Sequence, residues 1–438
     1  MNVLLITFSF PPAGGVGVLR ALSLAKYLPE NGVRVDVLTA RNAPAVVRDE
    51  GLLRQVPTSV TVHRTWTLDL PFALRKGIRK LLSREKSGTL APAAATNAAP
   101  AKANPLKTFI ANLLLPDPQI GWLPFASRAA ARIVRTRQID AVLITVPPFS
   151  SLMLAKQLRK QFPKLTIVLD FRDEWLNTTL QLVSLNSNPK ARLVADRTER
   201  EAVIAATAVV AVTEAARDVI RSRYPDQPAE KFVSISNGYD GAPPTSVSPQ
   251  IKAKTVTLTY LGSVYGSTEP SSFVEAVLGL APELRARLRI RFVGHCEKAA
   301  YRDTLLRMGD TVTVSGFLPQ AEALALLDAT DYVLLLSHDP VNVSAKFYDY
   351  LRSAKPILAA VHPDGDVRRR LEETRGGRWA DIADVDAIRR MLVDAIEQPT
   401  GQTFQPDLDA VARYHRKPLA AQYASLLHSL SPATETAR

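Results

Sequence analysis

The chain has 438 residues, of which 46% are hydrophobic and 22% are charged, a length that exceeds one ordinary core and suffices for two domains. Its single cysteine, Cys296, excludes a disulfide framework and a cysteine-rich metal site, and it is typical of a protein in a reducing cytosol. A net charge of +13 favours anionic partners, but no zinc-finger spacing, RNA-binding motif or basic helical stripe supports nucleic acid as the partner.

The first half of the chain alternates short β-branched runs with helical stretches. The opening run reaches a proline pair without a preceding basic region, so it predicts a first strand and no signal peptide. Near-continuous apolarity is typical of parallel strands that are covered on both faces. Strands are expected at 2–8, 33–40, 141–146, 166–171, 208–213 and 232–237. This rhythm predicts a doubly wound α/β domain over residues 1–240.

An insertion at about 70–115 interrupts this domain. Residues 72–86 ("FALRKGIRKLLSREK") combine apolar positions at helical spacing with six basic residues, and 106–115 supply a second apolar helix. The Ala- and Pro-rich stretch 88–104 between them reads as a tether. A basic amphipathic helix is typical of a membrane-surface element. A hairpin packed on the first domain, with solvated charges, is the alternative.

The Pro- and Ser-rich stretch 240–254 predicts a linker, after which the same rhythm restarts in a second domain over 255–400. Its strands are expected at 256–262, 288–294, 312–317, 332–337 and 356–361, and an amphipathic helix is expected over 408–430. Two α/β halves joined in this way form a cleft, and ligands of such sheets bind outside the carboxyl ends of the strands. No uninterrupted apolar run has the length of a membrane-spanning helix.

A glycine-rich turn, "SFPPAGGVGVLR", follows the first expected strand. Gly14, Gly15 and Gly17 permit close backbone approach, and the next helix presents its N-terminal N–H groups to an anion. The spacing is not a dinucleotide fingerprint, because it reads GGxG and no acidic residue ends the second strand. A tight turn without a ligand is the alternative interpretation.

Seven motifs occur in a fixed order: "FPPAGGVGVLRALSLAKYLPENG", "PDPQIGWLPFA", "VPPFSS", "LDFRDEW", "SISNGYD", "YLGSVYG" and "KFYDYLRSAKPILAAVHPDGD". In this order the chain resembles the retaining glycosyltransferases of family 4, and most of all the bacterial members that build cell-surface polysaccharides. The resemblance implies the GT-B fold, in which two Rossmann-like doubly wound domains face each other across a cleft. It also implies that the first domain binds the acceptor, that the second binds the donor, and that the segment 401–438 crosses back to the first domain.

The last motif carries the donor-binding residues that this resemblance implies. Asp349 occupies the position of the acidic residue that grips the donor ribose, where Glu is usual in the family. Lys346, one turn earlier, faces the diphosphate and stabilises the negative charge that develops on the departing nucleotide. The turn at Gly262 and Ser263 lies against the same diphosphate, but it lacks the basic residue usual in relatives, so it offers only backbone and hydroxyl donors.

Two further residues are candidates for the donor site. Arg20, one turn into the helix after the glycine turn, reaches the diphosphate from the first domain, or it is a solvated helix residue. His295 ends an expected strand near the cleft, where it contacts the base or the phosphate, or is a structural loop residue.

The acceptor site is expected at the glycine turn, with Gly14 and Gly15, and at the stretch "LDFRDEW". Charges that follow a strand point into the cleft, so Asp173, or the adjacent acidic residue, binds the acceptor hydroxyl or accepts its proton. Arg172 is expected to hold an acceptor phosphate and Trp175 to stack on a sugar. A buried pair of Asp170 and Arg172 is the alternative.

The chain departs from its relatives at Leu152, because the family usually has a histidine in or after this turn. Retaining transfer does not require an enzymic base, since the leaving phosphate oxygen can take the acceptor proton. The six histidines are scattered and no HxH or DxD element occurs, so we expect no metal and no cofactor.

The sequence therefore predicts a retaining, metal-independent glycosyltransferase with a UDP- or GDP-type sugar donor. The expected acceptor is a polyprenyl-linked or other saccharide at the inner face of the cytoplasmic membrane, which the protein touches through about 72–115. A nucleotide-sugar epimerase or hydrolase on the same fold is one alternative. A catalytically silent GT-B scaffold at the membrane is the other, and a nucleic-acid-binding role is the weakest.

Overall fold

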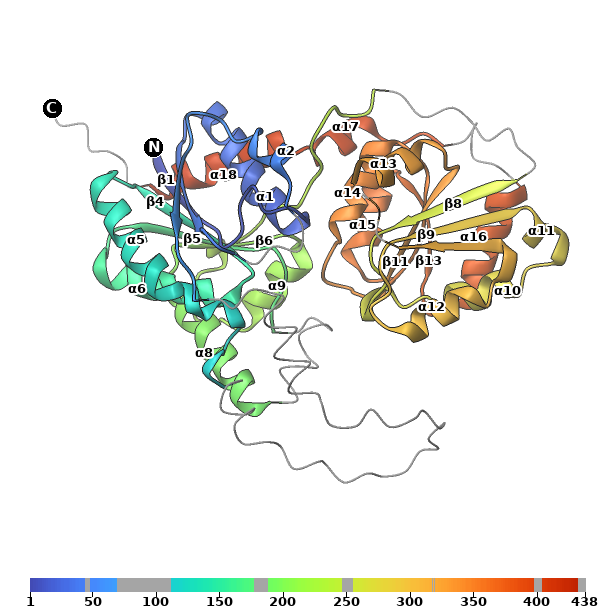
Figure 1. Ribbon diagram of the computed structural model, residues 1–438, viewed down its shortest axis with the longest axis horizontal. Coiled ribbons are helices and arrows are strands. Elements are labelled where there is room, and N and C mark those ends of the chain that lie inside the picture. The colour runs from blue at the N-terminus through green and yellow to red at the C-terminus, as the bar shows by residue number, and fades with distance from the viewer. Residues whose placement is uncertain are drawn as a thin grey trace. The chain divides into compact units, whose positions relative to one another are not determined.

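The computed structural model describes residues 1–43, 48–68, 112–176, 188–245, 255–316, 318, 320–397 and 404–431. The chain divides into two compact units, each with a parallel sheet (Figure 1). The first comprises Met1–Phe171, Ser184–Val209 and Ala424–Arg438, and the second comprises Arg172–Val183 and Val210–Tyr423. The expected membrane helix over 72–86 and most of the linker 240–254 lie outside the described residues.

The first sheet has seven strands in the order β3-β2-β1-β4-β5-β6-β7. They are β1 (Asn2–Ile6), β2 (Arg34–Ala40), β3 (Thr61–Thr65), β4 (Ala141–Val146), β5 (Thr166–Phe171), β6 (Ala208–Ala211) and β7 (Phe232–Ser234). Every residue of β4 and β5 is buried, which accounts for their continuous apolar sequence. The chain reverses its direction of progress across the sheet between β1 and β4, so this is a doubly wound sheet.

α-Helices and short 3-10 helices connect these strands. They are α1 (Val16–Tyr27), η1 (Pro29–Asn31), α2 (Glu50–Leu53), η2 (Pro118–Trp122), α5 (Leu123–Thr136), η3 (Phe149–Leu152), α6 (Met153–Gln161), α8 (Pro189–Ala205), α9 (Glu214–Ser222) and η4 (Ala229–Lys231). Asn188 and Thr213 cap α8 and α9 by accepting backbone hydrogen bonds. Gly32, with φ of 74°, ends the segment after α1 as the sequence indicates.

The second sheet has six strands in the order β10-β9-β8-β11-β12-β13. They are β8 (Val256–Leu261), β9 (Leu288–Val293), β10 (Val312–Ser315), β11 (Tyr332–Ser337), β12 (Ile357–Val361) and β13 (Gly377–Asp381). The connecting helices are η5 (Gly266–Thr268), α10 (Ser271–Leu278), α11 (Pro282–Ala286), α12 (Ala299–Leu306), η6 (Gly309–Thr311), α13 (Gln320–Asp328), α14 (Ala345–Ser353) and α15 (Asp366–Thr374). After the last strand come α16 (Val385–Glu397), α17 (Leu408–Ala412) and α18 (Arg416–Leu430).

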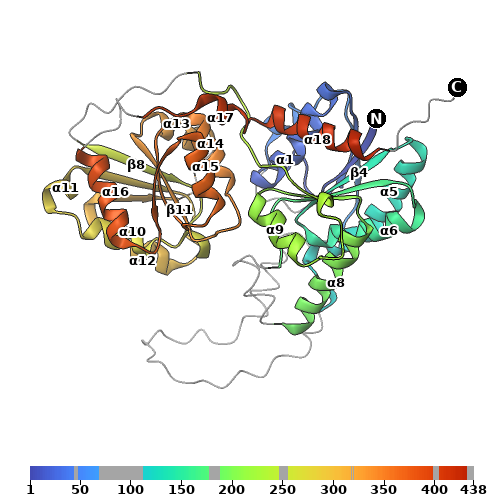
Figure 2. The ribbon, with the colours of Figure 1, turned by 180° about the vertical axis from the view of Figure 1, so that it is seen from behind.

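Both faces of the second sheet are apolar because helices cover both. Tyr332 and Leu334 of β11 pack with residues of α10, α12 and α16, whereas the alternate residues Val333 and Leu335 pack with α14 and α15. Figures 1 and 2 show these two helical layers on opposite sides of the strands. This alternation with a period of two is what a strand buried on both faces requires.

The expected strands are all present, and two further strands were missed. Both missed strands, β3 ("TVHRT") and β13 ("GRWAD"), lie at sheet edges, where most of their residues are partly exposed. Edge strands need no continuous apolar run, so the sequence pattern gave no signal for them. The single helix expected over 408–430 is two helices, separated at Arg413–His415. None of the helices within the described ranges is long and apolar enough to cross a membrane.

Gly238 in the "SISNGYD" motif permits a close backbone approach. A Cβ atom there would lie 2.1 Å from the carbonyl oxygen of Tyr414 and 2.7 Å from the side chain of Leu419. The chains on either side are joined by backbone hydrogen bonds from Tyr239 N to Tyr414 O and from Arg416 N to Tyr239 O.

We therefore expect Gly238→Ala to lower Tm by about 5 °C or more, because the backbone must move to relieve the overlap. Calorimetric melting of the full chain measures this change. Gly266→Ala is the matched control, since nothing lies within 4 Å of a Cβ atom at Gly266. Equal melting of the two variants would contradict the packing role of Gly238.

Candidate active site

Helix α14 presents Lys346 and Asp349 from one side. Its other side is anchored in the core, where Phe347 and Tyr350 are fully buried and Leu351 is nearly so. Residues three apart on a helix share a face, so the anchored side leaves Lys346 and Asp349 together on a less buried face. The helix begins just beyond the carboxyl end of β11, where ligands of doubly wound sheets bind.

The amine of Lys346 packs against a buried tyrosine. Its Nζ lies 2.5 Å from the hydroxyl of Tyr260 and 3.7 Å from the centre of that ring. Burial lowers the pKa of Lys346 to about 7. In the part of the chain that the structure describes, no carboxylate forms an ion pair with this amine. A desolvated cation without a neutralising partner is suited to receive an anion.

The turn after β8 lies against this lysine. Gly262 has φ of +113°, and a Cβ atom there would lie 3.6 Å from the Nζ of Lys346. The hydroxyl of Tyr260 donates a hydrogen bond to Ser263 O at 3.0 Å, and the hydroxyl of Tyr350 accepts one from Leu261 N at 2.8 Å. Gly262 and Ser263 are exposed, but the N–H of Gly262 already donates to Val293 O at 2.8 Å, so the expectation of a backbone donor at Gly262 was wrong. The donors that this turn offers to a ligand are the N–H and the hydroxyl of Ser263.

Asp349 is a partly buried carboxylate. Burial raises its pKa, and the positive charges of Arg416 and Arg352 oppose that rise. None of the residues within the described ranges donates a hydrogen bond to this carboxylate. It therefore retains its capacity to accept hydrogen bonds from the hydroxyl groups of a ligand.

His295 follows β9 at the same edge of the sheet, and it is exposed. Its backbone carbonyl accepts a hydrogen bond from Val264 N at 2.9 Å, which ties it to the turn after β8. The structure thus brings together Lys346, Asp349 and the turn at 262–263, with His295 beside that turn.

Arg20 is buried in the first unit and forms an ion pair. Its Nε and Nη2 donate to the carboxylate of Asp170 at 3.0 to 3.1 Å, and both side chains are largely inaccessible. Arg20 is therefore not a solvated helix residue, and the ion pair fixes α1 to β5. Gly15 at the start of α1 has φ of +96° and open space around it, and Gly14 is partly exposed.

The stretch after β5 contains residues in different environments. Asp173 is exposed, and its charge adds to the rise that burial causes in the pKa of Tyr265. Glu174 is buried and accepts hydrogen bonds from Arg223 at 2.7 Å and from Leu176 N at 3.2 Å. Trp175 is 2% exposed, so stacking of its ring on a sugar requires the loop to rearrange. Arg172 is partly buried.

Sequence reasoning missed Tyr260, Tyr350 and Asp117. The carboxylate of Asp117 accepts hydrogen bonds from Ser150 N and Oγ, both at 2.7 Å, and from Gln119 N at 3.1 Å. It joins the "PDPQIGW" and "VPPFSS" motifs, whose shared occurrence was the only available signal. Leu152, where relatives have a histidine, is fully buried.

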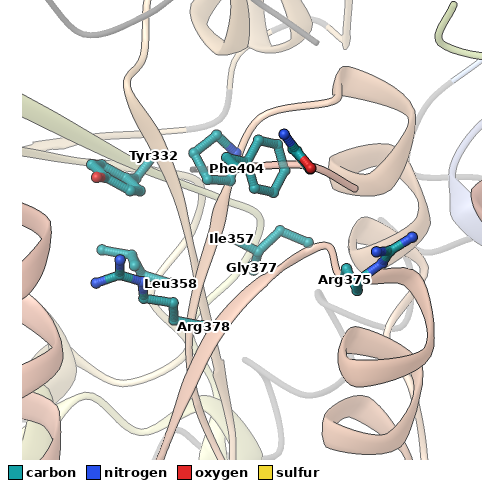
Figure 3. Close-up of a pocket in the computed structure, with 9 residues that line it drawn as sticks. Tyr332, Ile357, Leu358, Arg375, Gly377, Arg378 and Phe404 are labelled. Carbon is teal, nitrogen blue, oxygen red and sulfur yellow. The ribbon is translucent and has the colours of Figure 1, made fainter. Parts of the chain in front are cut away.

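A cavity of about 360 Å³ lies at the amino ends of the strands of the second sheet, opposite the carboxyl ends near Lys346 (Figure 3). It is lined by the first residues of β11, β12 and β13 and by Arg375, Arg378 and Phe404. Arg375 is 3.5 Å from Asp407, and Arg378 is 3.7 Å from Asp394. Because it lies at the amino ends of the strands, this cavity is separate from the candidate site around Lys346, which lies at their carboxyl ends. Among the described residues, no group of His, Cys, Asp or Glu is arranged to hold a metal ion.

Two doubly wound parallel sheets in one chain are the architecture of the GT-B class of glycosyltransferases. A sequence model of the glycosyl transferase 4-like domain matches residues 14–238, just over half of the chain. The chain therefore belongs to the family of glycosyl transferase 4-like proteins. Comparison with curated proteins finds no match.

Solved structures share the fold over nearly the whole chain. The sucrose-phosphate synthase of Thermosynechococcus elongatus is 15% identical, with a TM-score of 0.62 over 98% of each chain. Anabaena HepE in complex with UDP-glucose is 15% identical, with a TM-score of 0.57 over 98% of this chain and 100% of that one. The lipopolysaccharide outer core galactosyltransferase WaaB is 11% identical, with a TM-score of 0.59 over 98% and 99%. These likenesses confirm the expected GT-B fold.

The lowered pKa of Lys346 predicts a pH-dependent stability difference. Between pH 7 and 10.5 the unfolded lysine binds more protons than the folded one, so the free energy of unfolding of the wild type rises with pH in this window. Lys346→Met should therefore be more stable than the wild type at pH 6, by at most about 5 kcal/mol, and less to the extent that solvent reaches the amine. This advantage should shrink towards pH 10.5.

Calorimetric melting of both proteins at pH 6 and pH 9.5 measures the difference. Lys156→Met, at an exposed lysine paired with Glu201 on the first unit, is the control. A K346M advantage that is equal at both pH values would contradict the desolvation of this amine.

Proposed function

We propose that the protein is a retaining glycosyltransferase that moves a sugar from a UDP- or GDP-type donor to a lipid-linked saccharide in surface polysaccharide synthesis. The observation that carries the proposal is the arrangement on α14. An amine without a neutralising carboxylate lies against a glycine turn, and one helical turn later Asp349 has a carboxylate free of hydrogen bonds from described residues. These are complementary to a diphosphate and to the hydroxyls of a ribose.

The chemical role of each residue follows from charge. As the bond between the sugar and the diphosphate breaks, negative charge develops on the leaving oxygen, and the Lys346 ammonium stabilises it. The N–H and hydroxyl of Ser263 add hydrogen bonds, and Gly262 lets the backbone approach the diphosphate closely. Asp349 accepts from the ribose, and His295 contacts the base or phosphate. Because the lysine supplies positive charge, we propose transfer without a metal ion. HepE, whose structure holds UDP-glucose, supports a sugar nucleotide as the donor.

Retention of configuration is proposed with the acceptor oxygen attacking on the face that the diphosphate leaves. The bond from the sugar to the acceptor forms as the bond to phosphate breaks, and the acceptor proton passes to the leaving phosphate oxygen. Asp173 orients that acceptor hydroxyl, and Arg20 is the contribution of α1 to the diphosphate. The buried ion pair of Arg20 with Asp170 has no net charge, so this contribution acts by fixing α1 to β5 and not by direct contact with the diphosphate.

The acceptor is proposed to bind the first domain, residues 1–240, through Gly14, Gly15, Arg172 and Trp175. The segment 401–438 completes that domain, and the membership of Ala424–Arg438 in the first compact unit supports this. Peripheral contact with the inner face of the cytoplasmic membrane is proposed through about 72–115. The net charge of +13 supports it, because anionic headgroups attract basic segments.

Calorimetric titration with UDP, GDP and their sugar conjugates tests the donor site. We expect one nucleotide family to bind, with affinity reduced about 10- to 100-fold by Lys346→Ala and by Asp349→Ala, because each removes a charged hydrogen-bonding partner. Lys156→Ala and Asp394→Ala, at exposed ion-paired residues, are the charge-matched controls.

Absence of binding by folded wild type, with lipid present, would overturn the transferase and favour a silent scaffold. Donor cleavage that needs no acceptor would instead favour a hydrolase or epimerase. Donor binding that survives both α14 substitutions would place the site elsewhere.

A further inference from the structure

The hydroxyl of Tyr260 occupies a fixed position between Lys346 and the turn after β8. It donates to Ser263 O at 3.0 Å, which directs its lone pairs away from the turn. Lys346 Nζ lies 2.5 Å from the same oxygen, and an ammonium can only donate. The direction of both hydrogen bonds is therefore set: the lysine donates to the tyrosine, and the tyrosine donates to the turn.

The ring of Tyr260 cannot move with its ligand. It is 0% exposed and stacks on Phe292 of β9 with ring centres 4.9 Å apart, and Phe273 of α10 packs edge-on against Phe292. Core side chains packed in this way stay in one rotamer. The ammonium of the long, flexible lysine side chain is thus hydrogen-bonded to a group whose own position is fixed by the core.

We propose that Tyr260 is a positioning residue for the donor phosphates, which holds the Lys346 ammonium against the Gly262–Ser263 turn. This inference rests on the proposed function, because it assumes that Lys346 faces a diphosphate. In this proposal, a buried core residue sets the direction in which the ammonium that binds the anion points.

The same contact couples donor binding to pH. The pKa of Lys346 is about 7 in the empty site, and the nearby diphosphate charge raises it, so binding above pH 7 takes up a proton. The hydroxyl of Tyr260 stabilises the charged amine more than the neutral one, because a hydrogen bond from an ammonium is charge-assisted. Among described residues, the titratable groups around this pair are Tyr265, Cys296 and Tyr350, whose pKa values burial raises, and Asp349 one turn along α14.

Tyr260→Phe tests the inference, because it keeps the ring and removes only the hydroxyl. Loss of a charge-assisted hydrogen bond should lower the pKa of Lys346 by about one unit. In calorimetric titrations with UDP, or with GDP if that is the nucleotide bound, Y260F should then match the wild type within about twofold at pH 5.5. At pH 8 it should bind about tenfold more weakly.

Tyr332→Phe is the matched control. Tyr332 is also a fully buried tyrosine of the second sheet, and its hydroxyl donates to Ala395 O at 3.3 Å, but it lies at the amino end of β11. It should leave the pH dependence of binding unchanged. A loss of affinity in Y260F that is the same at every pH would overturn the inference, because a structural defect alone produces that result.

A second measurement needs no donor. Selective ¹³Cε labelling of lysine, with K346M to assign the resonance, gives the titration midpoint of Lys346 by NMR in the full chain. Y260F should lower the midpoint by about one unit, and an unchanged midpoint would overturn the inference. Failure of the wild type to bind either nucleotide would overturn the proposed function instead, and the NMR titration would still decide whether Tyr260 controls Lys346.

Discussion

The exclusion of water from the Lys346 amine is the constraint on which the candidate site depends. An amine in water binds a phosphate weakly, because solvent screens the attraction and must be displaced. Here Tyr260 and the glycine turn shield the amine from solvent before any ligand binds. This shielding destabilises the charged form of the amine, as its lowered pKa indicates. The core of α14, with its buried aromatic residues, holds the amine in place against this cost.

Two core tyrosines on opposite faces of the second sheet hold the turn after β8 in place. Tyr260 and Tyr350 have rings in the hydrophobic layers on opposite faces of the second sheet, and both hydroxyls bond to the backbone of residues 261–263. The turn of the candidate site is therefore held in place by two core residues. The packing of the sheet and the geometry of the candidate site are therefore coupled, because a substitution at either tyrosine changes both.

The sequence predicted the parts of this protein that follow from local patterns. Continuous apolar runs located the central strands, and the motif order pointed to α14 with Lys346 and Asp349. Edge strands β3 and β13 were missed because most of their residues are only partly buried, so they need no continuous apolar run. Arg20 pairs with Asp170, which lies 150 positions away in the sequence, and Tyr260 contacts Lys346, which lies 86 positions away. A pattern of neighbouring residues cannot predict contacts between such distant positions.

The carboxylate of Asp349 makes the candidate donor site depend on a residue near the end of the chain. Arg416, the first residue of α18, acts on that carboxylate and also donates to Gly238 O at 3.0 Å. A fragment cut to the second Rossmann-like repeat would keep Lys346 and Asp349 but lose this arginine. Its carboxylate would then hold a proton more readily and accept hydroxyl groups less well. The proposed ribose-binding carboxylate thus depends on a chain that continues past α17, so the smallest unit with the complete candidate site is longer than the sheet that carries it.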